Sequence, residues 1–99
     1  MIYPYKKTEP VIHETAFIAD NAVITGDVTI REQSSIWFSS VIRGDVAPVR
    51  IGKGVNIQDL SCLHQSPERP LVIEDGVTVG HQVTLHSSCL LYTSDAADD

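Results

Sequence analysis

An aliphatic residue recurs at every sixth position of the first half of the chain. The positions that open this pattern are Ile12, Ile18, Ile24, Ile30, Ile36 and Ile42. It resumes after each of two insertions, at Ile51, Ile57 and Leu63 and then at Ile73, Val79 and Leu85. A six-residue period fits neither an α-helix nor a single long strand, but it fits a chain that turns a corner after each short strand. The pattern therefore predicts an all-β fold, a parallel β-helix whose triangular coils stack around one aliphatic core.

The repeat divides the chain into about four coils with two interruptions. The predicted coils span residues 12–29, 30–50, 51–72 and 73–88. The second coil has three extra residues in Asp45–Arg50, and the third has four extra around Gln65–Leu71. Both insertions contain proline and are expected to leave the triangular path as loops. Residues 1–11 carry Pro4 and Pro10, which suits an irregular or edge segment.

The last eleven residues break the repeat. Residues 89–99 resemble the translation of a transposase-type sequencing adapter and are interpreted as a non-native tail. Residues 1–88 are then the N-terminal part of a β-helix domain that is truncated near Ser88. Because an open last coil leaves backbone groups unpaired and core side chains uncovered, we expect the chain as it stands not to be a competent enzyme.

Composition excludes several classes of function. The 99 residues carry a net charge of −6, which falls to −3 without the three aspartates of the predicted tail. Mild acidity without a basic cluster argues against nucleic-acid binding. No apolar run is long enough to span a membrane, and the N-terminus does not match a signal peptide, so we expect a cytoplasmic protein. Cys62 is the single cysteine outside the tail, which suits a reducing compartment.

The same register that buries the aliphatic residues places polar residues in outward columns. Arg43, His64 and His86 each follow the first aliphatic residue of a third strand, so they are expected to stack on one face, about 4.8 Å apart. A second outward column contains Asp59 and His81, on the preceding strand of each coil. Two neighbouring imidazoles on one face can share a metal ion at about 2.0–2.1 Å.

His81 is not expected to join His64 and His86 within one chain. It precedes His86 by five residues on an extended path across a corner, which separates the two by more than roughly 10 Å. A third histidine ligand must then come from another copy, as in a cyclic trimer with a site at each interface. The alternative is that these are ordinary surface histidines, as His13 is expected to be.

Three segments of the chain carry a combined motif: Arg43-Gly44-Asp45, Asn56-Ile57-Gln58-Asp59 with His64 soon after, and Gly80-His81-Gln82-Val83-Thr84-Leu85-His86. Together they resemble the γ-class carbonic anhydrases and their bacterial γ-carbonic-anhydrase-like relatives. The resemblance covers residues 1–88. It implies a left-handed β-helix and a homotrimer that binds Zn²⁺, or Fe²⁺ or Co²⁺, between subunits. The implied activity is reversible hydration of carbon dioxide to bicarbonate by a metal-bound hydroxide at the trimer interface.

The resemblance also implies a role for each site residue. The metal ligands would be His64 and His86 of one chain and His81 of its neighbour. The residues of the catalytic surroundings would be Gln58, Asn56, Arg43, Asp59 and Asp45. Gln58 would hydrogen-bond the metal-bound water, and Asn56 would be a polar residue behind it or on the substrate side. Arg43 is expected to pair with Asp59 across the interface, beside Asp45, although it could instead face an anion.

The sequence departs from the best-characterised members of the family in its acidic residues. Those proteins carry glutamates that move protons, whereas here Val46 follows Asp45 and Glu68 is the only carboxylate of the Gln65–Leu71 insertion. Because fast hydration needs proton export, the extent of hydratase activity stays open. Two other readings also stay open: a hexapeptide-repeat acyltransferase that uses coenzyme A thioesters, and a non-catalytic trimeric protein that keeps the metal as an interface staple.

Overall fold

The computed structural model describes residues 1–65, 70–86 and 89–90, and these residues form strands and turns with no helix. The twelve strands are β1 (Ile2–Tyr3), β2 (Val11–Ile12), β3 (Phe17–Ile18), β4 (Val23–Ile30), β5 (Ser35–Ile36), β6 (Val41–Ile51), β7 (Asn56–Ile57), β8 (Cys62–His64), β9 (Leu71–Ile73), β10 (Thr78–Val79), β11 (Thr84–His86) and β12 (Cys89–Leu90). Every pairing between them is parallel. The predicted all-β parallel β-helix of hexapeptide repeats is confirmed.

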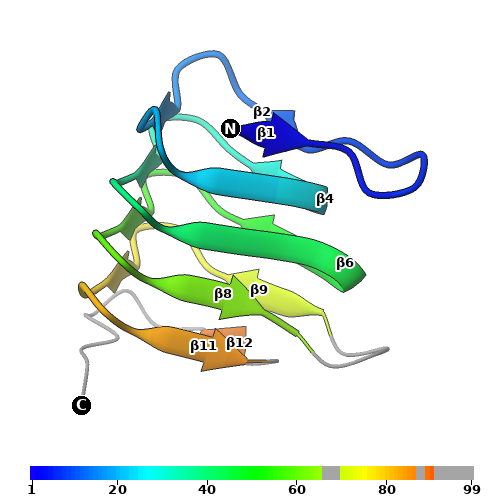
Figure 1. The fold of residues 1–99 in the computed structure, drawn as a ribbon. Coiled ribbons are helices and arrows are strands. Elements are labelled where there is room, and N and C mark those ends of the chain that lie inside the picture. The colour runs from blue at the N-terminus through cyan, green and yellow to red at the C-terminus, as the bar shows by residue number, and fades with distance from the viewer. Residues whose placement is uncertain (66–69, 87–88, 91–99) are drawn as a thin grey trace.

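The strands line the faces of a solenoid whose coils stack on one another (Figure 1). One face is the four-stranded sheet β3-β5-β7-β10. A larger sheet covers the rest, because β4 and β6 each run unbroken across a corner. The early part of β4 pairs with β1 and the early part of β6 pairs with β8, which β11 follows. The late part of β4 pairs with β2, and the late part of β6 pairs with β9. Each coil therefore contributes to three faces, as the six-residue period predicts.

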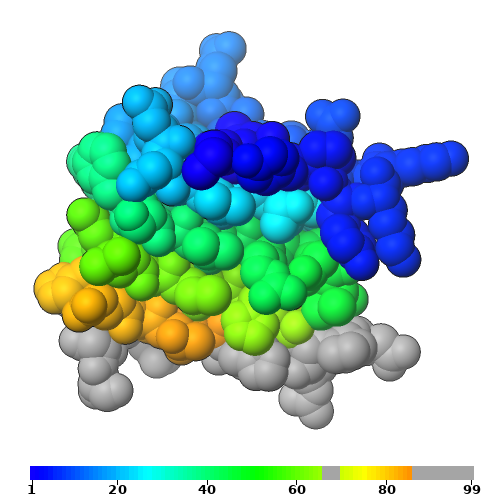
Figure 2. Space-filling model, viewed as in Figure 1, coloured from blue at the N-terminus to red at the C-terminus, as the bar shows by residue number. Residues whose placement is uncertain are grey.

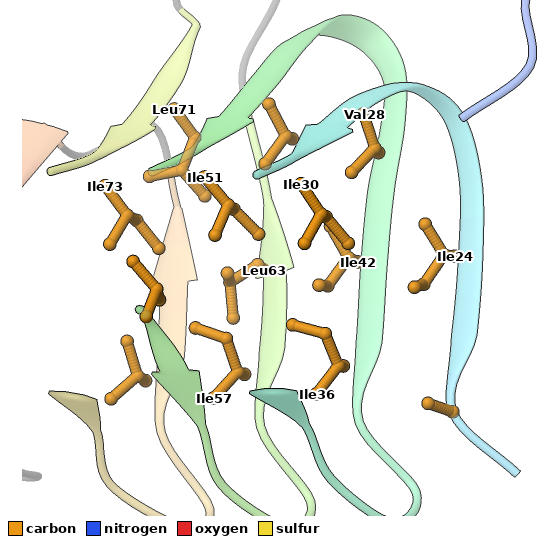
Figure 3. Close-up of a cluster of buried hydrophobic side chains, with 14 of the residues drawn as sticks. Ile24, Val28, Ile30, Ile36, Ile42, Ile51, Ile57, Leu63, Leu71 and Ile73 are labelled. Carbon is orange, nitrogen blue, oxygen red and sulfur yellow. The ribbon is translucent and has the colours of Figure 1, made fainter. Parts of the chain in front are cut away.

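The aliphatic residues of the repeat are register partners in successive coils. Ile36 pairs with Ile57, and Ile42 pairs with Leu63. All four side chains are fully buried and lie in stacked columns inside the solenoid (Figure 3). Burial of one such side chain contributes about 1.5–3 kcal/mol. The core therefore fixes the register, and with it the direction of every outward side chain.

The insertion in β6 has the predicted size, but Asp45–Arg50 are part of the continuous strand Val41–Ile51 and do not form the expected loop. Gly26 pairs with Gly44 but Val28 pairs with Val49, so β6 holds three more residues than β4 between these pairs. Backbones come very close there, because a Cβ atom on Gly44 would lie 2.5 Å from the carbonyl oxygen of Asp27. The bulge is therefore built on glycine, since any larger residue would force the neighbouring coil away.

The strands near the two ends of the predicted domain belong to the larger sheet. β1 lies at the edge of the larger sheet, where Ile2 pairs with Ile24, as expected for an edge segment. The segment between β1 and β2 extends away from the stack (Figures 1 and 2). Cys89–Leu90 pair with β9, so the coil continues two residues past the predicted start of the tail. Glu68, Ser88 and residues 91–99 lie outside the described residues, and the origin of the tail stays a prediction. Among the described residues, no helix could cross a membrane.

Candidate metal centre

A surface groove with a volume of about 620 Å³ brings together four of the predicted site residues. The residues that line it are Trp37, Asn56, Gln58, Asp59, Leu60, His81 and Gln82. They come from the β5, β7 and β10 face and from the turns that follow it, and they include Asp59 and His81, which were predicted to share one outward column. A groove lined by three amides, a carboxylate and an imidazole can bind a small polar ligand through several directed hydrogen bonds.

Buried serines fix the backbone of the groove from inside the solenoid. Ser40 Oγ donates to the carbonyl oxygen of Gln58 over 2.7 Å. Ser61 Oγ donates over 2.7 Å to the carbonyl oxygen of Gly80, the residue before His81. Each hydroxyl also accepts a backbone N–H, from Ser61 and Val83 respectively, over 3.3 Å. Because both hydroxyls are buried and satisfied, they hold the segments that carry Gln58 and His81 at fixed positions.

The turns beside the groove adopt an uncommon backbone conformation. Leu60 and Gln82 occupy equivalent positions in successive coils with φ of 65° and 59°. Non-glycine residues rarely adopt positive φ, and such residues persist where the surrounding structure holds them. The N–H of Gln82 donates to the carbonyl oxygen of Asp59 over 2.9 Å, which ties the two turns together. The turns that carry Asp59 and His81 are therefore hydrogen-bonded to each other.

The two remaining histidines lie on the next face. His64 ends β8 and is half-buried, and its Cα atom is the register partner of the His86 Cα atom in β11. The predicted stacking of positions 64 and 86 is thus present in the backbone, while the side chain of His86 lies outside the described part. Arg43 continues β6 one residue beyond the Ile42–Leu63 pair, in the phase of His64. Neither His64 nor Arg43 lines the groove that contains His81.

Arg43 pairs with Asp45 within the chain. Its Nε and Nη2 atoms donate to Asp45 Oδ2 over 3.1 and 2.8 Å. Burial by itself would raise the pKa of Asp45, but the hydrogen bonds and charge of Arg43 outweigh it and hold that pKa below its ordinary value. Asp45 Oδ1 is buried and has no hydrogen-bond partner among the described residues. The expected pairing of Arg43 with Asp59 needs a second copy of the chain and stays a prediction.

Trp37 is a groove residue that the sequence analysis did not assign. Its indole Nε1–H donates to Asn56 Oδ1 over 2.7 Å, and its ring packs on Phe17 with the centroids 4.8 Å apart. The register could have indicated this role, since Trp37 and Gln58 hold equivalent positions in neighbouring coils. The outward column that contains Gln58 could therefore have drawn attention to Trp37.

Within the described residues, no group of three histidine, cysteine, aspartate or glutamate side chains is placed to hold one metal ion. The predicted site residues instead form two groups on neighbouring faces. One group contains Asn56, Gln58, Asp59 and His81, and the other follows the Arg43, His64 and His86 column.

Comparison with known proteins identifies the family, although no family model matches the chain. A Bacillus subtilis protein named an uncharacterized transferase, YtoA, is 76% identical over 90 residues, which are 91% of this chain and 53% of that protein. A Geobacillus kaustophilus carbonic anhydrase is 69% identical over 88 residues, or 89% of this chain and 48% of that protein. A mitochondrial γ carbonic anhydrase of Arabidopsis thaliana is 43% identical over 83 residues, or 78% and 30%. The chain belongs to the γ-carbonic-anhydrase-like family.

A solved structure has the same fold. The crystal structure of a candidate acetyltransferase from Bacillus cereus superimposes with a TM-score of 0.86 at 64% identity. It covers 88% of this chain, and the match covers 51% of that structure. The chain thus spans about half the length of the relatives in the two Bacillus species and in Geobacillus.

Proposed function

We propose that this γ-carbonic-anhydrase-like protein catalyses the reversible hydration of carbon dioxide to bicarbonate with a zinc ion held between two copies of the chain. The observation that carries the proposal is the register of His64 with His86 in neighbouring parallel strands. Two ligand positions about 4.8 Å apart on adjacent strands suit a shared ion. The identity of 69% to a protein named a carbonic anhydrase supports the reaction class.

The zinc ion would be held by His64 and His86 of one copy and by His81 of its neighbour. The donor set fits, because three neutral imidazoles are a known catalytic zinc shell that keeps a position open for water or substrate. Fe²⁺ and Co²⁺ also accept imidazole ligands. The chemistry that a bound ion supplies is Lewis acidity, which makes a water molecule acidic enough to react near neutral pH.

A cyclic trimer would unite the two groups of site residues. In the single chain His81 opens to the groove, whereas His64 belongs to the neighbouring face. A head-to-tail arrangement around a threefold axis would bring the His64 face of one copy against the groove of the next and would form three equivalent sites. Arg43, already fixed by Asp45, would then lie near Asp59 of the neighbouring copy.

The amides of the groove would orient the reacting molecules. Gln58 and Asn56 stay neutral at all relevant pH values, so they can donate and accept hydrogen bonds without competing for the proton. Gln58 would hold the attacking water, and Asn56 would contact it or the substrate oxygen. Preorganised hydrogen bonds of this kind lower the cost of aligning a small substrate such as carbon dioxide.

An acyltransferase is the second candidate function. The names of the Bacillus subtilis and Bacillus cereus relatives favour it, since they are called a transferase and a candidate acetyltransferase. In that case His81 would act as a general base on an acceptor in the groove, next to a coenzyme A thioester. The acyltransferase does not require the register of His64 with His86, and the carbonic anhydrase does.

One set of assays separates these functions. We would purify two proteins: the 99-residue chain, and an extended protein that adds the second half of the Bacillus subtilis relative. For both we would measure oligomeric state, bound zinc, carbon dioxide hydration and acetyl transfer from acetyl-coenzyme A. The proposal expects a trimeric extended protein with zinc and with hydration that chelation abolishes.

The other outcomes each identify a different function. Acetyl transfer that survives chelation, without hydration, would contradict the proposal and favour the acyltransferase. Zinc in a trimer without either activity would instead favour a structural metal. The 99-residue chain, measured in parallel, tests the expectation that it is not a competent enzyme.

A further inference from the structure

Trp37 is the only tryptophan of the chain, and its one polar side-chain atom hydrogen-bonds to the groove residue Asn56. The indole Nε1–H donates to Asn56 Oδ1 over 2.7 Å. Indole nitrogen is a donor only, whereas an asparagine amide has one accepting and one donating end. The donor at Nε1 therefore fixes which end of Asn56 faces Trp37, and the Nδ2 amino group must face the other way.

The position of the indole is itself fixed. Trp37 packs on Phe17 with a centroid distance of 4.8 Å and an interplanar angle of 45°, and it also contacts Phe38 at 6.2 Å. The backbone N–H of Trp37 donates to the carbonyl oxygen of Ile57 over 2.9 Å, which ties it to the strand that carries Asn56. A ring held at its face and at its backbone can direct a hydrogen bond with little conformational freedom.

Asn56 lines the groove that also contains Gln58 and His81. No hydrogen bond to Asn56 Nδ2 or to the Gln58 side chain occurs among the described residues. Asn56 and Gln58 flank the buried Ile57, and both are half-buried. The groove therefore offers a fixed N–H donor beside a second amide.

We propose that Trp37 is a positioning residue that holds the Asn56 amide with its amino group toward the groove. The donor then meets an oxygen atom of the ligand, and bicarbonate has the required acceptor oxygens. This inference rests on the proposed function for the identity of the ligand, but not for the orientation of the amide. Without the indole N–H, Asn56 can rotate by half a turn and present its oxygen, which repels an anion.

The first test examines the hydrogen bond in the 99-residue chain. Because Trp37 is the sole tryptophan, its indole N–H gives a single signal in proton NMR spectra. Asn56→Ala should move this signal upfield and speed its exchange with solvent. An indole signal that does not respond to Asn56→Ala would overturn the inference, whatever the protein catalyses.

The second test measures bicarbonate affinity in the extended protein with a double-mutant cycle. Replacing Trp37 by 3-benzothienylalanine keeps the ring shape and exchanges the N–H for sulfur. We expect this change and Asn56→Ala each to weaken bicarbonate binding about fivefold, with the double variant no weaker than Asn56→Ala alone. Losses that multiply to about 25-fold would show that the two residues act independently and would overturn the inference.

A matched variant separates the effect of the N–H group on bicarbonate binding from the effect of ring packing. Phe17→Leu loosens the stack but keeps the indole donor, so it should weaken bicarbonate binding less than the loss of the N–H does. An equal loss in both variants would assign the effect to packing and contradict the inference.

Binding and turnover separate this inference from the proposed function. Coupled bicarbonate binding without any carbon dioxide hydration would refute the proposed function and leave the role of Trp37 standing. If the unmodified extended protein does not bind bicarbonate, the ligand assigned to the Asn56 donor is wrong.

Discussion

Coils one and three of this solenoid share a core pattern but differ in what they present to solvent. Their inward residues match, since Ile18 and Ile57 belong to one column of register partners. Their outward residues do not: coil one carries His13, whose ring nitrogen Nδ1 lies 2.9 Å from the Thr15 hydroxyl, whereas coil three carries the groove amides and His64. The comparison shows that the core fixes position and that outward substitutions on an unchanged scaffold create the chemistry.

The largest expected effect tests the shared core. Ile57 has an exposed fraction of 0% and has a coil on either side, whereas Ile18 is only half-buried. Ile57→Ala should therefore lower the free energy of unfolding by about 2–5 kcal/mol, and Ile18→Ala by clearly less. Urea denaturation of both variants measures the difference. Equal losses would mean that the position of a coil in the stack does not determine its contribution to the core.

The next effect tests the different outward faces. In the extended protein, His64→Ala should weaken zinc binding by at least about 100-fold, because an incomplete shell of imidazoles remains. His13→Ala is the matched control and should leave zinc binding unchanged. Titration with a zinc-selective chelator measures both affinities. If the two variants lose zinc to the same extent, His64 of coil three is not a zinc ligand.

The smallest expected effect concerns pH and the bulge between the coils. Because the pKa of Asp45 is lowered from its ordinary value of 3.8 in the folded state, its ionisation stabilises the fold above that value, and the contribution is lost as the pH falls through the lowered pKa. Solvent screens the pair, since 49% of the Arg43 side chain is exposed, so Asp45→Asn should cost no more than about 1 kcal/mol at neutral pH.

The control for this pH effect lies in coil one. Asp20 is exposed and makes no side-chain ion pair among the described residues. Thermal unfolding between neutral pH and pH 3 should show the gap between the parent chain and Asp45→Asn closing in acid, with no such change for Asp20→Asn. A gap that does not depend on pH would contradict the assigned role of the Arg43–Asp45 pair.

The scaffold could be predicted from the sequence because the aliphatic residue at every sixth position can only face the core. A residue such as Ile57 or Leu63 must face the core, so the register, the coils and the size of the Asp45–Arg50 insertion all followed from counting. The same counting placed positions 64 and 86 side by side, and the backbone of β8 and β11 agrees. These features depend only on spacing along the chain.

Other features depend on side-chain rotation, which spacing does not specify. Arg43 donates to Asp45, two residues away on the same strand, a bond that spacing alone does not predict. Its expected pairing with Asp59 across an interface stays a prediction. The bond from Trp37 to Asn56 crosses diagonally between coils, so no single column predicts it. The periodicity of one chain likewise does not predict which residues meet between two copies.

Mixing two inactive variants tests the central claim, that His81 completes the metal site of a neighbouring copy. His64→Ala and His81→Ala forms of the extended protein would be unfolded together, refolded and separated from their parents by affinity tags. Each variant alone should lose most of its zinc. In a cyclic trimer that contains both variants, one interface joins an intact His64 face to an intact His81, so about one site in three should regain zinc and hydration activity. Mixed trimers that form but recover no zinc would contradict the cross-subunit site.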